Sequence, residues 1–335
     1  MGTFSANGEY LAGWAWRSVG VWRVKDGKQV ATMKARFVQC LAVSNDGRWI
    51  AAGTFDGDTL VWDANTYKRV FEHYDIGEIH SVDFSPDSTR LVSAKNGTAI
   101  VWDIATNKQV RTLRHEGLIA AKYSPQGDQI ATVTLADGSV RVWDNNSDHL
   151  LVDIPLEVST YNTDLLWFHN HLFVLSKSEI KKFDSSTGSA LSQWPVLDGN
   201  KDSRIALPNH GEFIAYSVKS TVTFWDTSRH NELGVLQLPE NSRSIALSPD
   251  GLLLASGGKD GKITIQSLSH ITVSIVFVWI TTFPNMFLTP LVIPNRIRFN
   301  PLVYSTFPRN LTSRSMAPCW THGNMASSQT RKRSQ

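Results

Sequence analysis

Hydrophobic and polar positions repeat along this chain with a period of forty to forty-two residues. Seven times, a short apolar run ends in a marker position that is Trp in five repeats, Phe in one and Gln in one. The seven markers are Trp22, Trp62, Trp102, Trp143, Phe183, Trp225 and Gln266. Composition alone does not produce a fixed period of this length. It therefore indicates one structural unit that is repeated and that packs against its neighbours.

Each repeat has the same internal order of turns and apolar runs. A turn rich in Pro, Asp and Gly, such as residues 85–87, precedes an apolar run such as residues 91–94. A second tight turn, such as residues 96–97, leads into the marker run, and a polar turn then leads to a fourth run such as residues 109–113. Four short antiparallel strands in each repeat predict the blade of a propeller.

The pattern resembles the WD-repeat β-propeller family over residues 1–267, and seven spaced matches are far more specific than one Trp-Asp pair. The resemblance implies an all-β fold, a seven-bladed β-propeller of four-stranded antiparallel blades with an irregular C-terminal tail. We expect the propeller to occupy residues 1–280 and residues 281–335 to form a disordered basic tail.

The family resemblance also implies a polar set within a blade, in which His, Ser or Thr, Asp and Trp are hydrogen-bonded in sequence. Blade four contains a full set, formed by His115, Thr132, Asp137 and Trp143. The Trp position is filled in three further blades by Trp62, Trp102 and Trp225. We expect all these residues to be structural, with Trp102 and Trp143 buried between blades.

Charge is distributed unevenly along the chain. Up to Asp260 there are 25 basic and 30 acidic residues, whereas the rest of the chain has eight basic residues and no acid. Because contacts to phosphate dominate binding to nucleic acid, a mildly acidic propeller is not expected to bind it. The two cysteines, Cys40 and Cys319, exclude a disulfide scaffold and a multi-cysteine zinc site.

The sequence offers little catalytic chemistry. It has no Gly-rich phosphate loop, no nucleophile elbow and no zinc-protease motif. The close pair His169 and His171 falls where other repeats have a turn, so an exposed turn is expected there and not a metal site. We expect no cofactor and no small-molecule substrate. An enzyme would need a convergent polar cluster in the central channel, which the repeat pattern does not predict.

The remaining function is binding of other proteins or peptides. By resemblance to the family, partners contact residues just before each first strand and in the turn before each blade Asp. The matching positions are Phe37, Gln39, Phe55, Glu78, His80, Lys95, Lys201, Ser203, Asn241, Arg243 and Lys259. Phe37 and Phe55 would be unusual on a surface unless they anchor a partner. The sequence therefore predicts a non-catalytic protein–protein interaction scaffold that assembles or recruits partner proteins.

The C-terminal region leaves alternatives open. Residues 268–294 contain no charged side chain, and residues 271–280 are strongly apolar. Residues 272–278 can fill the outer-strand position of blade seven. Alternatively, residues 271–294 anchor the propeller to a membrane, although Pro284, Pro290 and Pro294 interrupt this run. In a third interpretation the tail replaces a normal continuation, and the chain is a fragment of a larger WD-repeat protein.

The N-terminus bears on how the ring closes. Thr3 already matches the end of a blade's first strand, whereas propellers of this family usually take the outer strand of the last blade from a segment before it. Either residues 271–278 close the ring or the chain is a fragment. No basic segment followed by an apolar run is visible at the N-terminus, so the expected location is the cytoplasm or the nucleus.

Overall fold

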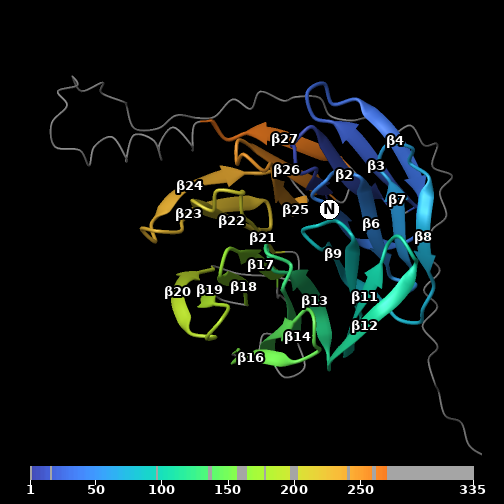
Figure 1. Ribbon diagram of the computed structural model, residues 1–335. Coiled ribbons are helices and arrows are strands. Elements are labelled where there is room, and N and C mark those ends of the chain that lie inside the picture. The colour runs from blue at the N-terminus through green and yellow to red at the C-terminus, as the bar shows by residue number, and fades with distance from the viewer. Residues whose placement is uncertain are drawn as a thin grey trace, which may run out of the picture.

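The structure, a computed structural model, describes residues 2–15, 17–95, 97–134, 138–156, 164–176, 179–196, 203–239, 242–258 and 262–269. Seven antiparallel sheets are arranged in a ring, with the first strand of each sheet nearest the centre (Figure 1). Six sheets have four strands, and the seventh has three among the described residues. The predicted all-β, seven-bladed propeller is confirmed.

The strands follow chain order within each blade. Blade one has β1 (Gly2–Phe4), β2 (Tyr10–Ala15), β3 (Ser18–Arg23) and β4 (Gln29–Lys34). Blade two has β5 (Val38–Val43), β6 (Trp49–Thr54), β7 (Thr59–Asp63) and β8 (Arg69–His73). Blade three has β9 (Ile79–Phe84), β10 (Arg90–Lys95), β11 (Gly97–Asp103) and β12 (Lys108–His115). Blade four has β13 (Leu118–Tyr123), β14 (Gln129–Thr134), β15 (Ser139–Asp144) and β16 (Leu150–Pro155).

The second half of the ring repeats this order. Blade five has β17 (Asp164–Phe168), β18 (His171–Leu175), β19 (Glu179–Asp184) and β20 (Ala190–Pro195). Blade six has β21 (Arg204–Ala206), β22 (Phe213–Val218), β23 (Thr221–Asp226) and β24 (Glu232–Gln237). Blade seven has β25 (Ser242–Leu247), β26 (Leu253–Gly258) and β27 (Ile263–Ser267). Each marker residue lies at the end of a third strand or one residue before it.

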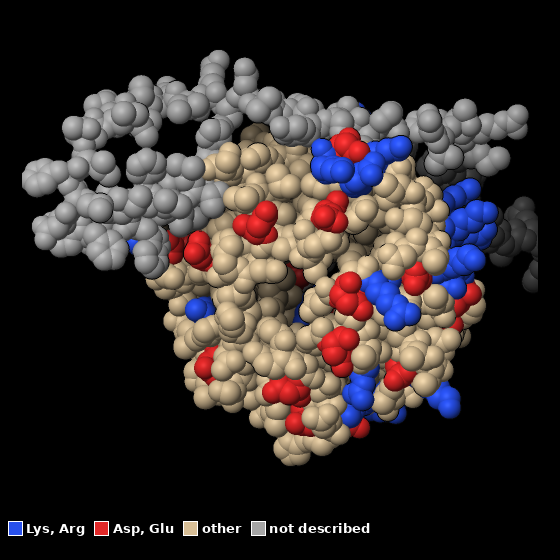
Figure 2. Space-filling model, turned by 45° about the horizontal axis from the view of Figure 1, so that its top comes forward, with Lys and Arg blue, Asp and Glu red and all other residues tan. Residues whose placement is uncertain are grey.

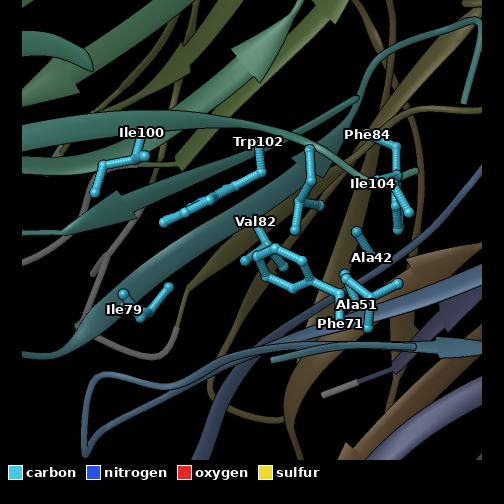
Figure 3. Close-up of a cluster of buried hydrophobic side chains, with 11 residues drawn as sticks. Ala42, Ala51, Phe71, Ile79, Val82, Phe84, Ile100, Trp102 and Ile104 are labelled. Atoms are coloured by element: carbon cyan, nitrogen blue, oxygen red, sulfur yellow. The ribbon is translucent and has the colours of Figure 1, made fainter. Parts of the chain in front are cut away.

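Apolar side chains fill the space between neighbouring blades. Between blades two and three, Phe71, Ile79 and Trp102 belong to one buried cluster (Figure 3). The edge of the Trp102 ring meets Phe71 at a centroid distance of 5.4 Å. Because each blade buries its faces on its neighbours, these clusters hold the ring together.

The first and last blades also share an apolar cluster. Phe4 and Leu11 of blade one pack with Ala255, Ile263 and Ile265 of blade seven. Strand β1 lies beside β25, so the ring is continuous at this seam among the described residues. Residues 271–294, for which a closing strand and a membrane anchor were both considered, lie outside the described residues.

The aspartate after the marker accepts hydrogen bonds from its turn in five blades; Asp226 accepts from two backbone N–H groups, and the other four accept from a hydroxyl as well. We refer to Asp63, Asp103, Asp144 and Asp184 as the marker aspartates. Each carboxylate accepts backbone N–H and hydroxyl hydrogen bonds from the turn between the third and fourth strands. These hydrogen bonds lower the pKa of all four carboxyl groups, to about 2 for Asp184.

The expectation that Trp143 is buried between blades is wrong in part. Trp102 is 3% exposed, whereas Trp143 is only half-buried. Phe71, on the fourth strand of blade two, covers Trp102 of blade three. The equivalent residue on the fourth strand of blade three, next to Trp143 of blade four, is Arg111. The Arg111 side chain turns instead to Asp148, with Nε at 2.6 Å from a carboxylate oxygen. A polar side chain at this position leaves part of the Trp143 ring open.

Candidate protein-interaction surface

The antiparallel order of the strands brings two sets of turns to one side of the ring. These are the connections from the fourth strand of a blade to the next blade, and the turns between second and third strands. We call this side the upper face. The predicted partner-contacting positions that the structure describes belong to these connections or to the strand ends beside them.

Phe37 and Phe55 lie next to each other on the upper face of blade two. The Phe55 N–H donates a hydrogen bond to the Phe37 carbonyl oxygen at 2.8 Å, which joins the β4–β5 connection to the β6–β7 turn. Phe37 is 41% exposed and Phe55 is 55% exposed. Phe37 also has a φ of 48°, a left-handed backbone conformation that non-glycine residues rarely adopt. Both aromatic side chains are therefore held at the surface by local backbone geometry.

The neighbouring β8–β9 connection extends this surface with two residues that the sequence analysis missed. Tyr74 is 66% exposed and Ile76 is 93% exposed. The connection lies directly on the β6–β7 turn, because a Cβ atom added to Gly57 would collide with the Asp75 carbonyl oxygen. We refer to Phe37, Phe55, Tyr74 and Ile76 together as the blade-two patch. Four exposed large apolar residues on adjoining turns are unusual on a protein surface.

Carboxylates border the blade-two patch. Burial raises the pKa of Asp58, and the nearby carboxylates of Asp56 and Glu72 add to this effect although Thr54 opposes it. The Tyr74 hydroxyl donates to Glu72, which also pairs with Arg69. The local field beside the patch is therefore negative. On the face shown in Figure 2, acidic side chains also lie around the central hollow of the ring.

Other predicted contact residues on the upper face are already engaged in local pairs. Lys95 forms an ion pair with Asp75, and His80 lies 3.8 Å from the Glu78 carboxylate. Gln39 is half-buried. These residues border the blade-two patch.

The prediction for Ser203 is wrong, because Ser203 is fully buried. It immediately precedes β21, and the Arg204 guanidinium donates to its carbonyl oxygen at 2.7 Å. Lys201, Asn241 and Lys259 lie outside the described residues, as does the side chain of Arg243.

The structure contains the hydrogen-bonded chain that the family resemblance implied, but the chain joins blades three and four, because His115 ends β12 of blade three. His115 is buried, and its Nδ1 lies 2.9 Å from the Thr132 hydroxyl, which also accepts a hydrogen bond from Trp143 Nε1 at 2.8 Å. The second His115 nitrogen lies 2.8 Å from the Ser139 hydroxyl. Asp137 lies outside the described residues.

In blade three, Trp102 Nε1 donates to Ser93 at 2.8 Å. Trp62 is buried and Trp225 is half-buried.

The innermost strands carry charged links that the sequence analysis missed. Asp83 on β9 accepts hydrogen bonds from Lys122 Nζ at 3.0 Å and from the Tyr123 N–H at 2.9 Å. Asp164 on β17 accepts from the Ile205 N–H at 3.2 Å. The sequence does contain a signal for the first of these links. Asp83 and Lys122 carry opposite charges at the same position of two successive first strands. The links join blade three to four and blade five to six.

These central groups are poor nucleophiles. Burial raises the pKa of the Cys40 thiol to about 12, so the thiolate is not populated at neutral pH. Burial alone would lower the pKa of Lys122, but the facing Asp83 carboxylate outweighs it and the pKa is raised. The lysine therefore stays protonated. Within the described ranges, no three His, Cys, Asp or Glu side chains are grouped to hold a metal ion.

His169 and Asn170 form the turn between β17 and β18, as expected, and His169 is exposed. No helix in the described part of the chain is long and apolar enough to span a membrane.

Comparison with known proteins agrees with the geometry of a β-propeller. The model of the WD domain, G-beta repeat matches residues 27–63, 65–103, 107–144 and 233–265. Four matched WD repeats within a ring of seven blades confirm the predicted resemblance to the WD-repeat β-propellers. The matched residues leave out blade five, the first three strands of blades one and six, and β16 of blade four.

Two curated relatives illustrate the level of similarity. WD repeat-containing protein 1 of Gallus gallus is 26% identical over 236 residues, which cover 64% of this chain and 38% of that protein. Small ribosomal subunit protein RACK1y of Oryza sativa subsp. japonica is 30% identical over 138 residues, which cover 38% of this chain and 41% of that protein. The chain thus matches less than half the length of these relatives.

Two solved structures share the fold. The β-propeller domain of Cps50 (Swd1) from Myceliophteria thermophila superposes with a TM-score of 0.72 at 18% identity, covering 80% of this chain and 95% of that domain. A chain of Kuenenia stuttgartiensis hydrazine synthase gives a TM-score of 0.70 at 16% identity with the same coverage. At these identities the similarity concerns the fold alone.

Proposed function

We propose that this propeller is a non-catalytic scaffold that binds other proteins on its upper face, with the blade-two patch as the main contact. The observation that carries this proposal is the exposure of Phe37, Phe55, Tyr74 and Ile76 on three adjoining turns. Exposure of large apolar side chains to water is unfavourable, and their burial under a partner lowers the free energy of the complex. Aromatic residues in particular dominate the energy of protein interfaces.

The charge beside the patch specifies the partner further. Arg69 pairs with Glu72, so Asp56 and Asp58 leave an excess of negative charge next to the exposed Tyr74 and Phe55 side chains. A matching segment therefore presents a large apolar side chain next to Lys or Arg. Such a pairing favours rapid encounter and excludes acidic segments. The relative RACK1y is named as a ribosomal subunit protein, that is, a member of an assembly, which is compatible with this role.

The groups at the ring centre support the absence of catalysis. The Cys40 thiol is held protonated and Lys122 is held as a cation paired with Asp83. Neither is available as a nucleophile or base near neutral pH. A cytoplasmic or nuclear location remains a prediction from the sequence.

Selection of binding peptides from a random displayed library tests the proposal. The immobilised full chain should select peptides with a large apolar residue next to Lys or Arg. Their binding should be lost in the variant Phe55→Ala/Tyr74→Ala/Ile76→Ala. The matched control Val110→Ala/Leu151→Ala/Leu191→Ala removes three exposed aliphatic side chains from the outer strands, and it should bind as the wild type does. Equal binding by both variants would refute the proposal.

A further inference from the structure

Blade seven differs from the other six blades at its outer edge. Among the described residues its last strand is β27, whereas every other blade has a fourth strand hydrogen-bonded at this place. An uncovered strand edge presents backbone N–H and C=O groups that pair readily with another strand. Ile263 and Ile265 of β27 are buried in the cluster shared with blade one, so the strand itself is firmly placed.

In the six complete blades the fourth strand pairs with the marker strand in one fixed register. Each marker residue faces the residue seven positions later along the chain. The six pairs are Trp22 with Gln29, Trp62 with Arg69, Trp102 with Gln109, Trp143 with Leu150, Phe183 with Ala190, and Trp225 with Glu232. In all six blades one extra residue on the fourth strand then bulges out.

The same register can be applied to the marker Gln266. We infer that residues 273–278 of this chain form the fourth strand of blade seven. Val273 then faces Gln266, Ile275 faces Ile265, and Phe277 faces Ile263. The placement of this segment lies outside the described residues, so the inference rests on β27, on the common register and on the sequence.

The side chains of residues 273–278 suit this position. Five of the six residues are Val, Ile or Phe, which favour strands. Phe277 falls at the position eleven residues after the marker. Large apolar side chains occupy this position and are buried in four other blades, as Met33, Leu113, Ile154 and Trp194. One departure is Ser274, which stands at the bulged position, where the other blades have Val or Leu. The residue at the bulged position is exposed or partly exposed in the six complete blades, so a polar residue is tolerated at this position in blade seven.

Cysteine cross-linking tests the register. In a Cys319→Ser background, Thr264→Cys/Val276→Cys places two thiols on directly facing residues, the equivalent of the pair Arg141 and Asp153. The control Thr264→Cys/Val278→Cys moves one thiol two residues along the same strand face, away from the bulge. Facing Cβ atoms are about 5 Å apart and diagonal ones about 7–8 Å, so only the first pair suits a disulfide. Under mild oxidation we expect at least about a five-fold higher intramolecular yield for the facing pair.

A second measurement does not depend on thiol geometry. Phe277→Asp should lower the thermal unfolding midpoint, whereas the matched control Phe287→Asp should leave it unchanged. Equal yields from the two cysteine pairs, together with equal midpoints for the two Asp variants, would overturn the inference. Cross-links formed mainly between chains, detected by mixing chains of two sizes, would also overturn it, because a second copy would then occupy the edge.

Discussion

Removal of the Trp102 side chain tests whether the marker residues hold neighbouring blades together. The Trp102 ring is 3% exposed and packs against Phe71 and His73 of blade two, with the His73 ring centroid at 4.3 Å. Its Nε1 donates to the buried Ser93 hydroxyl. In Trp102→Ala both the interblade contact and this hydrogen bond are lost.

The expected loss follows from these contacts. A buried large-to-small change of this kind costs about 3–5 kcal/mol of unfolding free energy. The Ser93 hydroxyl loses its partner, which adds about 1 kcal/mol. Ser93→Ala alone should therefore cost about 1 kcal/mol. Trp143→Ala should cost less than Trp102→Ala, because the Trp143 side chain is only partly buried.

Urea unfolding followed by far-UV circular dichroism measures these differences. A double-mutant cycle with Phe71→Ala should give a coupling of about 0.5–1.5 kcal/mol across the blade boundary. A loss below about 1 kcal/mol for Trp102→Ala would show that the marker position does not carry the blade contact.

Further predictions concern charge and the tail. The marker aspartates have lowered pKa values in the fold, so their contribution to stability is present above about pH 4 and is lost as the pH falls through the folded pKa values, which is about 2 for Asp184. Changing all four to Asn should flatten the fall of the thermal midpoint over this range. Lys122→Met should lower the free energy of unfolding by about 1–2 kcal/mol at neutral pH. Because the Lys122 pKa is raised, the difference from wild type should begin to shrink near the unfolded pKa of about 10.4 and should vanish only above the folded pKa, and Lys122→Arg should be mild. Deleting residues 285–335 should leave the midpoint unchanged, whereas deleting residues 270–335 should lower it; equal midpoints would contradict the proposed fourth strand.

The repeat period made most of the fold predictable from the sequence. Marker spacing and turn residues located all seven sheets, because each blade solves the same local packing problem with the same pattern of residues. The marker aspartates could also be interpreted correctly, since a carboxylate that recurs once per blade serves a local turn. Burial was harder to predict. The exposure of Trp143 depends on Arg111, a residue of another blade that the local pattern does not reveal.

The interaction surface was only partly predictable. Phe37 and Phe55 were found because an aromatic residue in a turn departs from the repeat pattern. Tyr74 and Ile76 were missed because they follow a fourth strand directly and look like its continuation. Ser203 was wrongly placed on the surface: it is fully buried, and the Arg204 guanidinium donates to its carbonyl oxygen. Contacts between turns of different blades exist only in the folded ring.

A footprint of a bound partner segment tests the central claim most directly. Hydrogen exchange of the full chain should be compared with and without a saturating peptide selected by the wild-type propeller. The account predicts slower exchange in the connections at residues 35–38, 55–58 and 74–77, and unchanged exchange in the turns on the opposite side of the ring, such as residues 44–48. Protection confined to the opposite side, or to the outer strands, would contradict a binding surface at the blade-two patch.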